Sequence, residues 1–449
     1  MSINSAWPCC PQAANFLENT CDRFLAANPR VQSMSDTMLR KAGVAIKDLV
    51  DHWTLPDSPE IRQTLFDAGF EHRLTGDADP VWLCPNARLA RVRLSGDINT
   101  VRMALAVEDI TAFEDAWNLP SAGRHGDVDS GYEEAHWNLT AGELAAVVRI
   151  GYGGFRPGDL SATYQRAIHQ IRLRLRGRDR GTPDDAIGAI NTAAELLKGV
   201  VEEIGAERAA DEFFAAEREY YTSRNRAAAL QCNLQCELGI GWANQDHHTY
   251  RSSREAFISL MGLWEILGFT MRERYYAGAE AGWGAQIVEH PVSRVVIFSD
   301  VDLAPDELNI DFSSEPLAGR SDMNLGTIGL WCALHGDSIG CAGMHHLECE
   351  YDFDAVSESL AAVDIGVMPP FTDLPVLKQA FTNAEVWSVA ADHLKLLEFR
   401  GDISSEQADR FSRCGAAGSH LEILQRREGF KGFNKTGVSA IILATDARN

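Results

Sequence analysis

The chain has 449 residues, with 41 lysines and arginines against 64 aspartates and glutamates, so its formal net charge is −23. This length exceeds one average domain of about 150 residues, and the 45% share of hydrophobic residues is typical of a folded protein rather than a disordered one. The acidic balance excludes a role in which lysine and arginine neutralise nucleic-acid phosphates, so we expect no nucleic-acid partner.

The start of the chain has neither the basic residues nor the apolar run of a signal peptide, and no stretch of about 18 apolar residues occurs. The ten cysteines show no spacing typical of a disulfide framework or a zinc site. We therefore expect a cytoplasmic protein with reduced thiols and no membrane partner.

A repeated pattern organises the chain. Asp51 to Phe70 and Asp246 to Phe269 each consist of a strand, an amphipathic helix, a glycine stop and a second strand. Met103 to Trp117 and His346 to Ala362 also begin as a strand followed by a helix. Further strand-like runs are Arg88 to Leu94, Ser293 to Phe298, Ala384 to Ala390 and His393 to Arg400. The repeating unit is then βαβββ.

This pattern predicts an α+β fold of paired βαβββ modules in two halves, with a helical insertion between them. The predicted parts are an N-terminal helical segment at 1–45, a first half at 46–156, the helical insertion at 157–235 and a second half at 236–449. The insertion carries five arginines at alternate positions from Arg172 to Arg180. They could form an anion or partner site, but a solvated face or an interdomain clasp is the favoured interpretation.

Two histidines and one glutamate are the candidate metal ligands. His247 and His346 each lie on the first strand of a repeat unit, so symmetric packing of two units would bring them together. Glu422 lies in the apolar strand Leu421 to Leu424, where a buried carboxylate needs a cation or hydrogen bonds. Two histidines and one carboxylate suit non-haem Fe(II). Each residue alone could equally be a structural one, and His248 or His345 could replace its neighbour, because strand alternation turns only one of each pair inward.

The segment Gly418 to Arg426, with Gly429 to Phe433 after it, resembles the C-terminal signature of 4-hydroxyphenylpyruvate dioxygenases. Gly340 to Leu347 is similar to the family's segment around its second histidine, and Asp246-His247 and Glu315-Pro316 resemble two further motifs. The likeness covers about residues 244 to 440. It implies a vicinal oxygen chelate fold whose first half has lost its metal and whose second half holds Fe(2+) through His247, His346 and Glu422.

The chain differs from this family at the positions that contact the family's substrate. Arg400 and Val438 align with its two stacking phenylalanines, Glu398 replaces a glutamine, and Ser314 replaces an asparagine. An aromatic substrate would lose its stacking partners, so a polar 2-oxo acid is expected, with Arg400 holding a second carboxylate. Arg400 and Glu398 could instead be outward charges. The other residues expected around the substrate and the histidines are Ser293, Gln425, Phe433 and Glu289.

The resemblance implies an Fe(II)-dependent dioxygenase that uses O₂ to decarboxylate and hydroxylate a small-molecule 2-oxo acid. It also implies a homo-oligomer. One alternative is a redox-neutral metal isomerase or lyase of the same fold, with Glu289 as a fourth ligand or base; another is a small-ligand-binding protein without catalysis. Four protein ligands would favour the redox-neutral enzyme, and three with Fe²⁺ the oxygenase.

Overall fold

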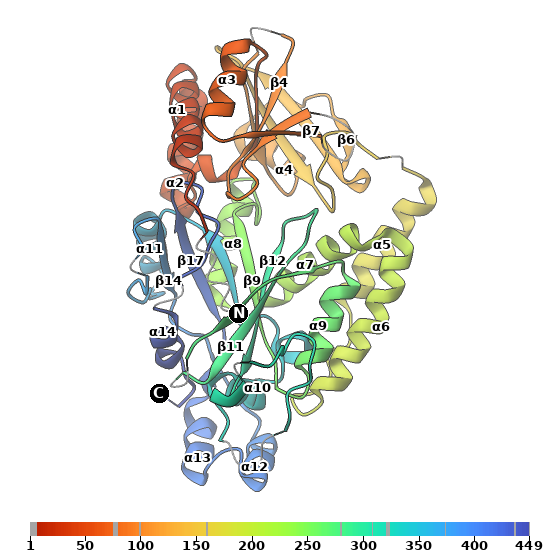
Figure 1. Ribbon diagram of the computed structural model, residues 1–449, viewed down its shortest axis with the longest axis vertical. Coiled ribbons are helices and arrows are strands. Elements are labelled where there is room, and N and C mark those ends of the chain that lie inside the picture. The colour runs from red at the N-terminus through yellow and green to blue at the C-terminus, as the bar shows by residue number, and fades with distance from the viewer. Residues whose placement is uncertain are drawn as a thin grey trace.

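The computed structural model describes residues 7–74, 80–97, 100–158, 160–278, 281–307, 309–319, 324–372, 374–434 and 437–448. Two mixed β-sheets form the two halves of the molecule and lie one above the other in Figure 1. None of the described helices is long and apolar enough to cross a membrane.

The first half starts with two helices and continues into a sheet with the order β2-β3-β4-β1-β5-β8-β7-β6. Its elements are α1 (Pro11–Ala27), α2 (Pro29–Ala42), η1 (Ile46–Leu49), β1 (Val50–Pro56), α3 (Pro59–Asp67), β2 (Glu71–Leu74), β3 (Pro80–Leu83), β4 (Arg91–Ser95), β5 (Arg102–Ala106), α4 (Ile110–Trp117), β6 (His125–Asp127), η2 (Val128–Ser130), β7 (Tyr132–Asn138) and β8 (Glu143–Arg149). The sheet is therefore two βαβββ units joined side by side through β1 and β5.

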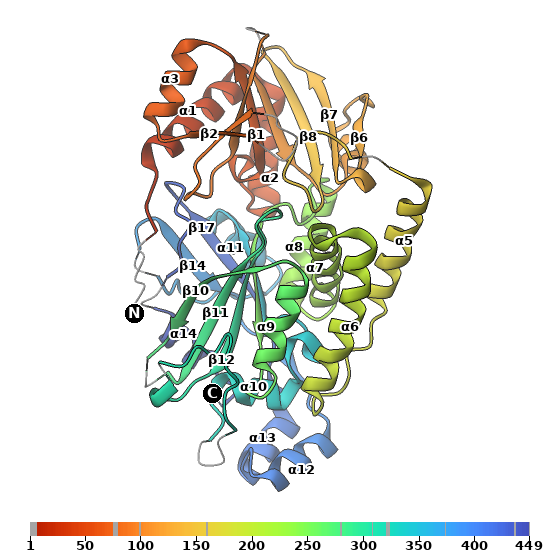
Figure 2. The same cartoon turned by 45° about the vertical axis from the view of Figure 1, so that its right-hand side comes forward.

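Four helices lie between the two sheets in the sequence. They are α5 (Ala162–Arg176), α6 (Ala186–Ile204), α7 (Ala206–Thr222) and α8 (Arg226–Glu237). In Figure 2, α5, α6 and α7 stand beside the second sheet, together with its own helix α9 (Phe257–Ile266). The helical character predicted for this stretch is confirmed.

The second half has the sheet order β10-β11-β12-β9-β13-β17-β14. Its remaining elements are β9 (Gln245–Arg251), β10 (Thr270–Tyr276), β11 (Trp283–Glu289), β12 (Val296–Asp302), η3 (Pro305–Glu307), α10 (Thr327–His335), η4 (Ser338–Ala342), β13 (His346–Glu350), α11 (Phe353–Ala361), β14 (Leu377–Phe381), β15 (Val386–Trp387), α12 (Ala391–Arg400), α13 (Ser405–Cys414), β16 (Ala416–Ala417), β17 (His420–Arg426) and α14 (Val438–Ala444). The α+β class with paired βαβββ modules is confirmed, although only three strands of the last module join the sheet.

Local sequence explains the repeated strand, helix and strand. Ser58 begins α3, where its Oγ accepts a hydrogen bond from the Ile61 backbone N–H at 3.2 Å. Gly69 after α3 and Gly268 after α9 have φ values of 90° and 83°, a conformation that glycine adopts without strain. Both predicted glycine stops are therefore confirmed.

One strand prediction is wrong. The run His393 to Arg400 belongs to α12, because its buried residues Leu394 and Leu397 are three positions apart, as on one face of a helix, and not two. The run Ala384 to Ala390 contains only the short β15. The strand that pairs with β17 at the edge of the sheet is instead β14.

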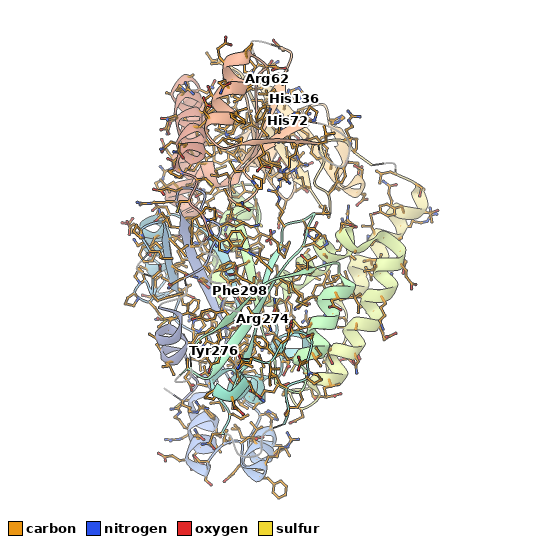
Figure 3. The ribbon with its side chains drawn as sticks, in the orientation of Figure 1. Arg62, His72, His136, Arg274, Tyr276 and Phe298 are labelled. Carbon is orange, nitrogen blue, oxygen red and sulfur yellow. The ribbon has the colours of Figure 1, made fainter. Side chains whose placement is uncertain are left out.

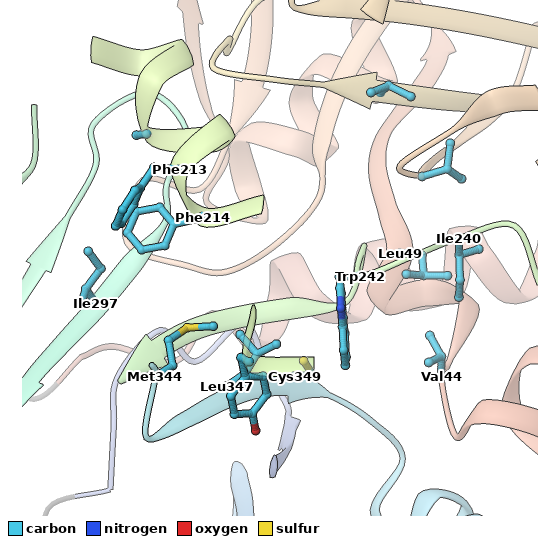
Figure 4. Close-up of a cluster of buried hydrophobic side chains, with 14 of the residues drawn as sticks. Val44, Leu49, Phe213, Phe214, Ile240, Trp242, Ile297, Met344, Leu347 and Cys349 are labelled. Carbon is cyan, nitrogen blue, oxygen red and sulfur yellow. The ribbon is translucent and has the colours of Figure 1, made fainter. Parts of the chain in front are cut away.

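The two sheets share one hydrophobic core. Figure 4 shows Val44 and Leu49 of the first half next to Ile240 and Trp242, which lead into β9. Leu347 and Cys349, on the helix-covered face of β13, continue the same cluster. The face of the second sheet that carries the candidate ligands is thus backed by a continuous apolar layer.

The arginines of the insertion form a clasp within the protein. Arg178 and Arg180 both pair with Glu217 of α7, at 3.0 and 2.7 Å, and Arg178 also donates to the carbonyl of Ile339 in η4. Arg172, Arg174 and Arg176 pair with further acids of α6 and α7. Arg178 and Arg180 confirm the interdomain clasp, because they bind the carbonyls of η4 shortly before His346, whereas the exposed Arg174 and Arg176 belong to a solvated face.

Substitution of one acid of this clasp tests how much the clasp contributes to the free energy of unfolding. We expect Glu217→Ala to lower the free energy of unfolding by about 3–5 kcal/mol, because it removes the only carboxylate with which the largely buried guanidinium groups of Arg178 and Arg180 pair among the described residues. The matched change Glu219→Ala removes an exposed pair with Arg176 and should cost less than about 1 kcal/mol. Urea unfolding of both variants measures the difference, and equal losses would contradict a buried clasp.

Candidate metal centre

Two central strands bring the predicted histidines to one face of the second sheet. β9 and β13 run antiparallel, with His247 opposite Glu348 and Thr249 opposite His346. β17 lies parallel to β13, with Glu422 next to Glu348. Since alternate residues of a strand share a face, the four side chains His247, His346, Glu348 and Glu422 converge. All four are buried.

The spacing of their atoms fits a metal site. The Glu348 Oε1 atom lies 3.0 Å from His247 Nε2 and 2.9 Å from His346 Nε2, and Glu422 Oε2 lies 3.4 Å from His346 Nε2. Two ligand atoms each about 2.1 Å from one metal ion are about 3.0 Å apart when they meet at a right angle. One atom each from His247, Glu348 and Glu422 also lie within 4.8 Å of one another. His346 belongs to the same group, because its Nε2 atom lies near one oxygen of each of the two carboxylates.

The electrostatics of the group call for a cation. Burial, together with the neighbouring Glu422, holds the pKa of Glu348 well above its ordinary value, and burial raises the pKa of Glu422 to about 8. Burial lowers the pKa of His247 to about 4 and keeps that of His346 well below its usual range. The Glu348 Oε2 atom is buried without a hydrogen-bond partner among the described residues. A divalent cation would balance two carboxylates between two neutral imidazoles, so the residues present fit a metal.

A carboxylate outside the group orients His247. Asp246 Oδ1 lies 2.7 Å from His247 Nδ1, which leaves Nε2 directed at the centre. Arg426 and Arg88 in turn pair with Asp246, at 2.8 and 2.9 Å. Burial alone would raise the pKa of Asp246, but these two charges outweigh it and hold the pKa well below its ordinary value. Asp246 is therefore ionised and able to accept the Nδ1 hydrogen.

The first half repeats this supporting arrangement. Asp51 lies 2.6 Å from His52 Nδ1 and pairs with Arg149 at 2.7 Å, as Asp246 does with His247 and Arg426. In both halves the arginine lies at the end of the strand two places from the histidine strand. The polar support of a histidine ligand is thus present twice.

The ligands themselves are not repeated. On β5, Ala104 is opposite His52 and Arg102 is opposite Thr54, so these residues take the places of Glu348 and His346. Ala145 of β8 takes the place of Glu422. Arg102 pairs with Glu134 and Glu143, at 2.9 and 2.6 Å, which puts an ion pair where the second half has its donor atoms.

Comparing the two modules within the second half identifies the residue that is the counterpart of Glu422 in the repeat. β12 pairs with β9 as β17 pairs with β13, and Phe298 is the β12 residue next to Thr249. Phe298 therefore stands where a symmetric site would have its fourth strand ligand. Its ring lies 4.7 Å from that of His247. Figure 3 shows Phe298 in the middle of the second half, far from His72 and His136 of the first.

The structure distinguishes the neighbouring histidines. His248 lies on the opposite face of β9, with its ring 4.9 Å from that of Phe214. His345 precedes β13 and packs against Trp331 at 5.2 Å. Neither lines the cavity beside the candidate centre, whereas His247 and His346 both do.

Of the residues predicted or aligned at the substrate, the structure brings Phe433 and Val438 to that cavity. Phe433 lines it, with its ring 5.4 Å from that of His247. Arg400 and Glu398 lie instead on the surface helix α12, where Arg400 pairs with Asp184 at 3.0 Å, so the alignment that placed them at the substrate is corrected. Ser293 lies in the turn before β12, and Ser314 is exposed on a loop.

Gln425 and Glu289 are also displaced from the centre. Gln425 is on the face of β17 opposite to Glu422 and bonds to Asp352 at 3.1 Å. Glu289, expected as a fourth ligand or base, pairs with Lys431 at 2.6 Å outside the cavity. Glu348 takes the place expected for Glu289. Its spacing of two residues from His346 on a strand is the signal in the sequence that could have identified it.

The cavity itself is small and partly aromatic. It has a volume of about 60 Å³, and Phe298, Phe371, Phe381 and Phe433 form much of its wall. Gln379 of β14 donates a hydrogen bond to Glu422. Gln379 and Phe381 had no part in the sequence-based site, because β14 was not recognised as the strand beside β17.

A buried arginine lies on the face of β9 that carries the histidine. Arg251 follows His247 and Thr249 at intervals of two residues and is 1% exposed. Its Nε and Nη2 atoms are buried without a hydrogen-bond partner among the described residues. After burial, the charge of Arg251 is the largest cause that lowers the pKa of His346. Arg251 does not line the cavity itself, but its neighbours Thr249 and Asp300 do, so two unused donors lie beside the candidate ligands.

Comparisons with known proteins identify neither a family nor a function for this chain. No family model matches the chain, and no curated protein does. Solved structures with a similar trace include a mutant of 4-hydroxymandelate synthase from Streptomyces coelicolor (12% identity, 89% of this chain and 98% of that one, TM-score 0.29). Others are methylmalonyl-CoA epimerase from Mycobacterium tuberculosis (12%, 41% and 88%, TM-score 0.23) and the uncharacterized protein YdcJ from Shigella flexneri (13%, 55% and 74%, TM-score 0.24). At these TM-scores the likeness carries no argument about activity.

Proposed function

We propose that the protein is a non-haem Fe(II) oxygenase that acts on a small 2-oxo acid. The observation that carries the proposal is the convergence of His247, His346 and Glu422 at one buried cavity, a two-histidine, one-carboxylate set that suits Fe(II) and oxygen chemistry. When bound, the metal would supply a Lewis-acidic, redox-active centre for the substrate's vicinal oxygens and for O₂.

The protein's own groups would fix that centre. Asp246 holds the Nδ1 side of His247, and Gln379 holds one oxygen of Glu422 by a hydrogen bond. Both contacts orient a ligand before a metal binds, which reduces the reorganisation that binding requires. The phenylalanine rings around the cavity exclude water from the same space.

The substrate class follows from the size of the cavity and from a buried arginine that lies beside it. A volume of about 60 Å³ is well below the roughly 300 Å³ of a typical drug-sized site, so a compact acid is favoured over a large aromatic one. The buried donors of Arg251 suit a carboxylate, because a guanidinium can bind both of its oxygens. Arg251 thus takes the role first expected of Arg400, and a short 2-oxo dicarboxylic acid is the substrate class we propose.

Glu348 supports a second candidate function. Its Oε1 atom lies about as close to both histidines as a fourth ligand would, and four protein ligands favour a redox-neutral isomerase or lyase. In that enzyme Glu348 would be a ligand or a base. In the oxygenase it would be a neighbouring acid that the metal does not require.

The duplicated support offers a matched test of metal binding. We expect Asp246→Asn to weaken Fe²⁺ binding by about 10- to 100-fold, because the amide no longer fixes His247. The equivalent change in the first half, Asp51→Asn, should leave the affinity unchanged. Competitive titration against a chromophoric chelator under anaerobic conditions measures both. Equal affinities for the wild type and Asp246→Asn would place the metal elsewhere.

Oxygen consumption distinguishes the two functions. After anaerobic loading with Fe²⁺, we expect a short 2-oxo dicarboxylic acid to stimulate O₂ uptake in an oxygen electrode, and Arg251→Gln to raise KM more than it lowers kcat. Glu348→Gln should keep both Fe²⁺ binding and O₂ uptake in the oxygenase, whereas it should abolish metal binding in the four-ligand enzyme.

The oxygenase proposal fails if no 2-oxo acid stimulates O₂ uptake and His346→Ala binds Fe²⁺ as tightly as the wild type does. Turnover of a chiral acid without O₂ consumption would establish the redox-neutral function instead.

A further inference from the structure

A second, larger cavity lies between the two halves. It has a volume of about 490 Å³, and its wall includes Asp51 and Arg91 of the first half and Glu289 and Arg294 of the second. Nine lysines and arginines face seven aspartates and glutamates around it. This local excess of positive charge is notable in a chain whose formal net charge is −23.

Most of the acids in the wall are already paired. Arg88 and Arg426 both pair with Asp246, and Arg88 also pairs with Glu350. Lys431 pairs with Glu289, at 2.6 Å. These contacts leave little acidic charge for the remaining cations.

Among the described residues of the wall, Arg91, Arg294 and the exposed Arg427 have no acidic partner, and the first two come from opposite halves of the molecule. Among the described residues, neither Arg91 nor Arg294 forms an ion pair within 4.0 Å, although the Arg91 Nη1 atom donates to the carbonyl of Gly153 at 2.7 Å. Arg91 belongs to β4, and Arg294 belongs to the turn between β11 and β12, so they face the cavity from opposite halves. Burial lowers the pKa of Arg91 to about 10, and the charges of Arg149 and Arg294 act in the same direction against that of Asp51. Cations that crowd one another in this way are stabilised by an anion between them.

We propose that this cavity binds a small organic or inorganic anion with at least two negative charges, held by Arg91 and Arg294. Its volume lies within the range of small-molecule sites, about 300–1,000 Å³. The guanidinium fork fits phosphate and carboxylate oxygens equally well, so both sources share the chemistry. The site adjoins the metal centre but has its own wall: Phe433 lines both cavities, whereas Arg91, Arg294 and Asp246 line only this one.

Binding to the metal-free full chain tests the proposal independently of any oxygenase activity. Isothermal titration at constant ionic strength would use inorganic pyrophosphate in one arm and citrate in the other. We expect saturable 1:1 binding of at least one anion, and the arm that responds identifies phosphate or carboxylate as the preferred group.

Matched variants assign that binding to the cavity. Arg294→Gln should weaken the binding by about tenfold or more, the loss expected for one charge-assisted hydrogen bond. Because Arg294 lies in an exposed turn, misfolding of the variant would not explain this loss. Arg91→Gln should act in the same direction. Arg400→Gln, on the remote helix α12, should bind as the wild type does. The proposal is overturned if neither anion gives saturable binding, or if Arg91→Gln and Arg294→Gln both bind as tightly as the wild type.

Discussion

The burial of two carboxylates beside two neutral histidines is the constraint on which the second half depends. Glu348 and Glu422 are buried on adjacent strands, and such a pair of carboxylates is costly without a compensating charge. The hydrophobic layer behind the sheet and the clasp around η4 hold the strands that carry these groups. The fold thus maintains an arrangement that a bound cation would stabilise.

Duplication of the βαβββ pair explains how such an arrangement is built. Each half places its first and fifth strands side by side, so a residue of one module meets its counterpart from the next. The support of the histidine, an aspartate and an arginine, is present in both halves, while the donor atoms are present in one. In the first half, Arg102 neutralises the carboxylate of Glu134, whereas in the second half a metal would neutralise the carboxylates of Glu348 and Glu422.

The sequence was sufficient where a pattern was local. The repeated Asp-His strands, the glycine stops and the apolar strand around Glu422 predicted the fold class and three of the converging side chains. It was insufficient where pairing between distant strands decided the outcome. Gln379 is near Glu422 only because β14 pairs with β17. The prediction that Arg400 lies at the site was wrong because its segment, with Leu394 and Leu397 buried on one face, is a helix. Arg251 shares a face with His247, which alternation could have indicated.

Phe298 is the counterpart of Glu422 in the repeat, and this difference makes the two modules of the second half unequal at the centre. The carboxylate of Glu422 is held by Gln379 on the β17–β14 side, whereas the ring of Phe298 takes the equivalent place on β12. Asp300 of β12 and Phe381 of β14 also line the cavity, so the inequality is confined to this pair of equivalent positions. Under the proposed function, a substrate held at the metal would have a polar group on one side and a ring on the other, and the two faces of a prochiral carbon there would not be equivalent.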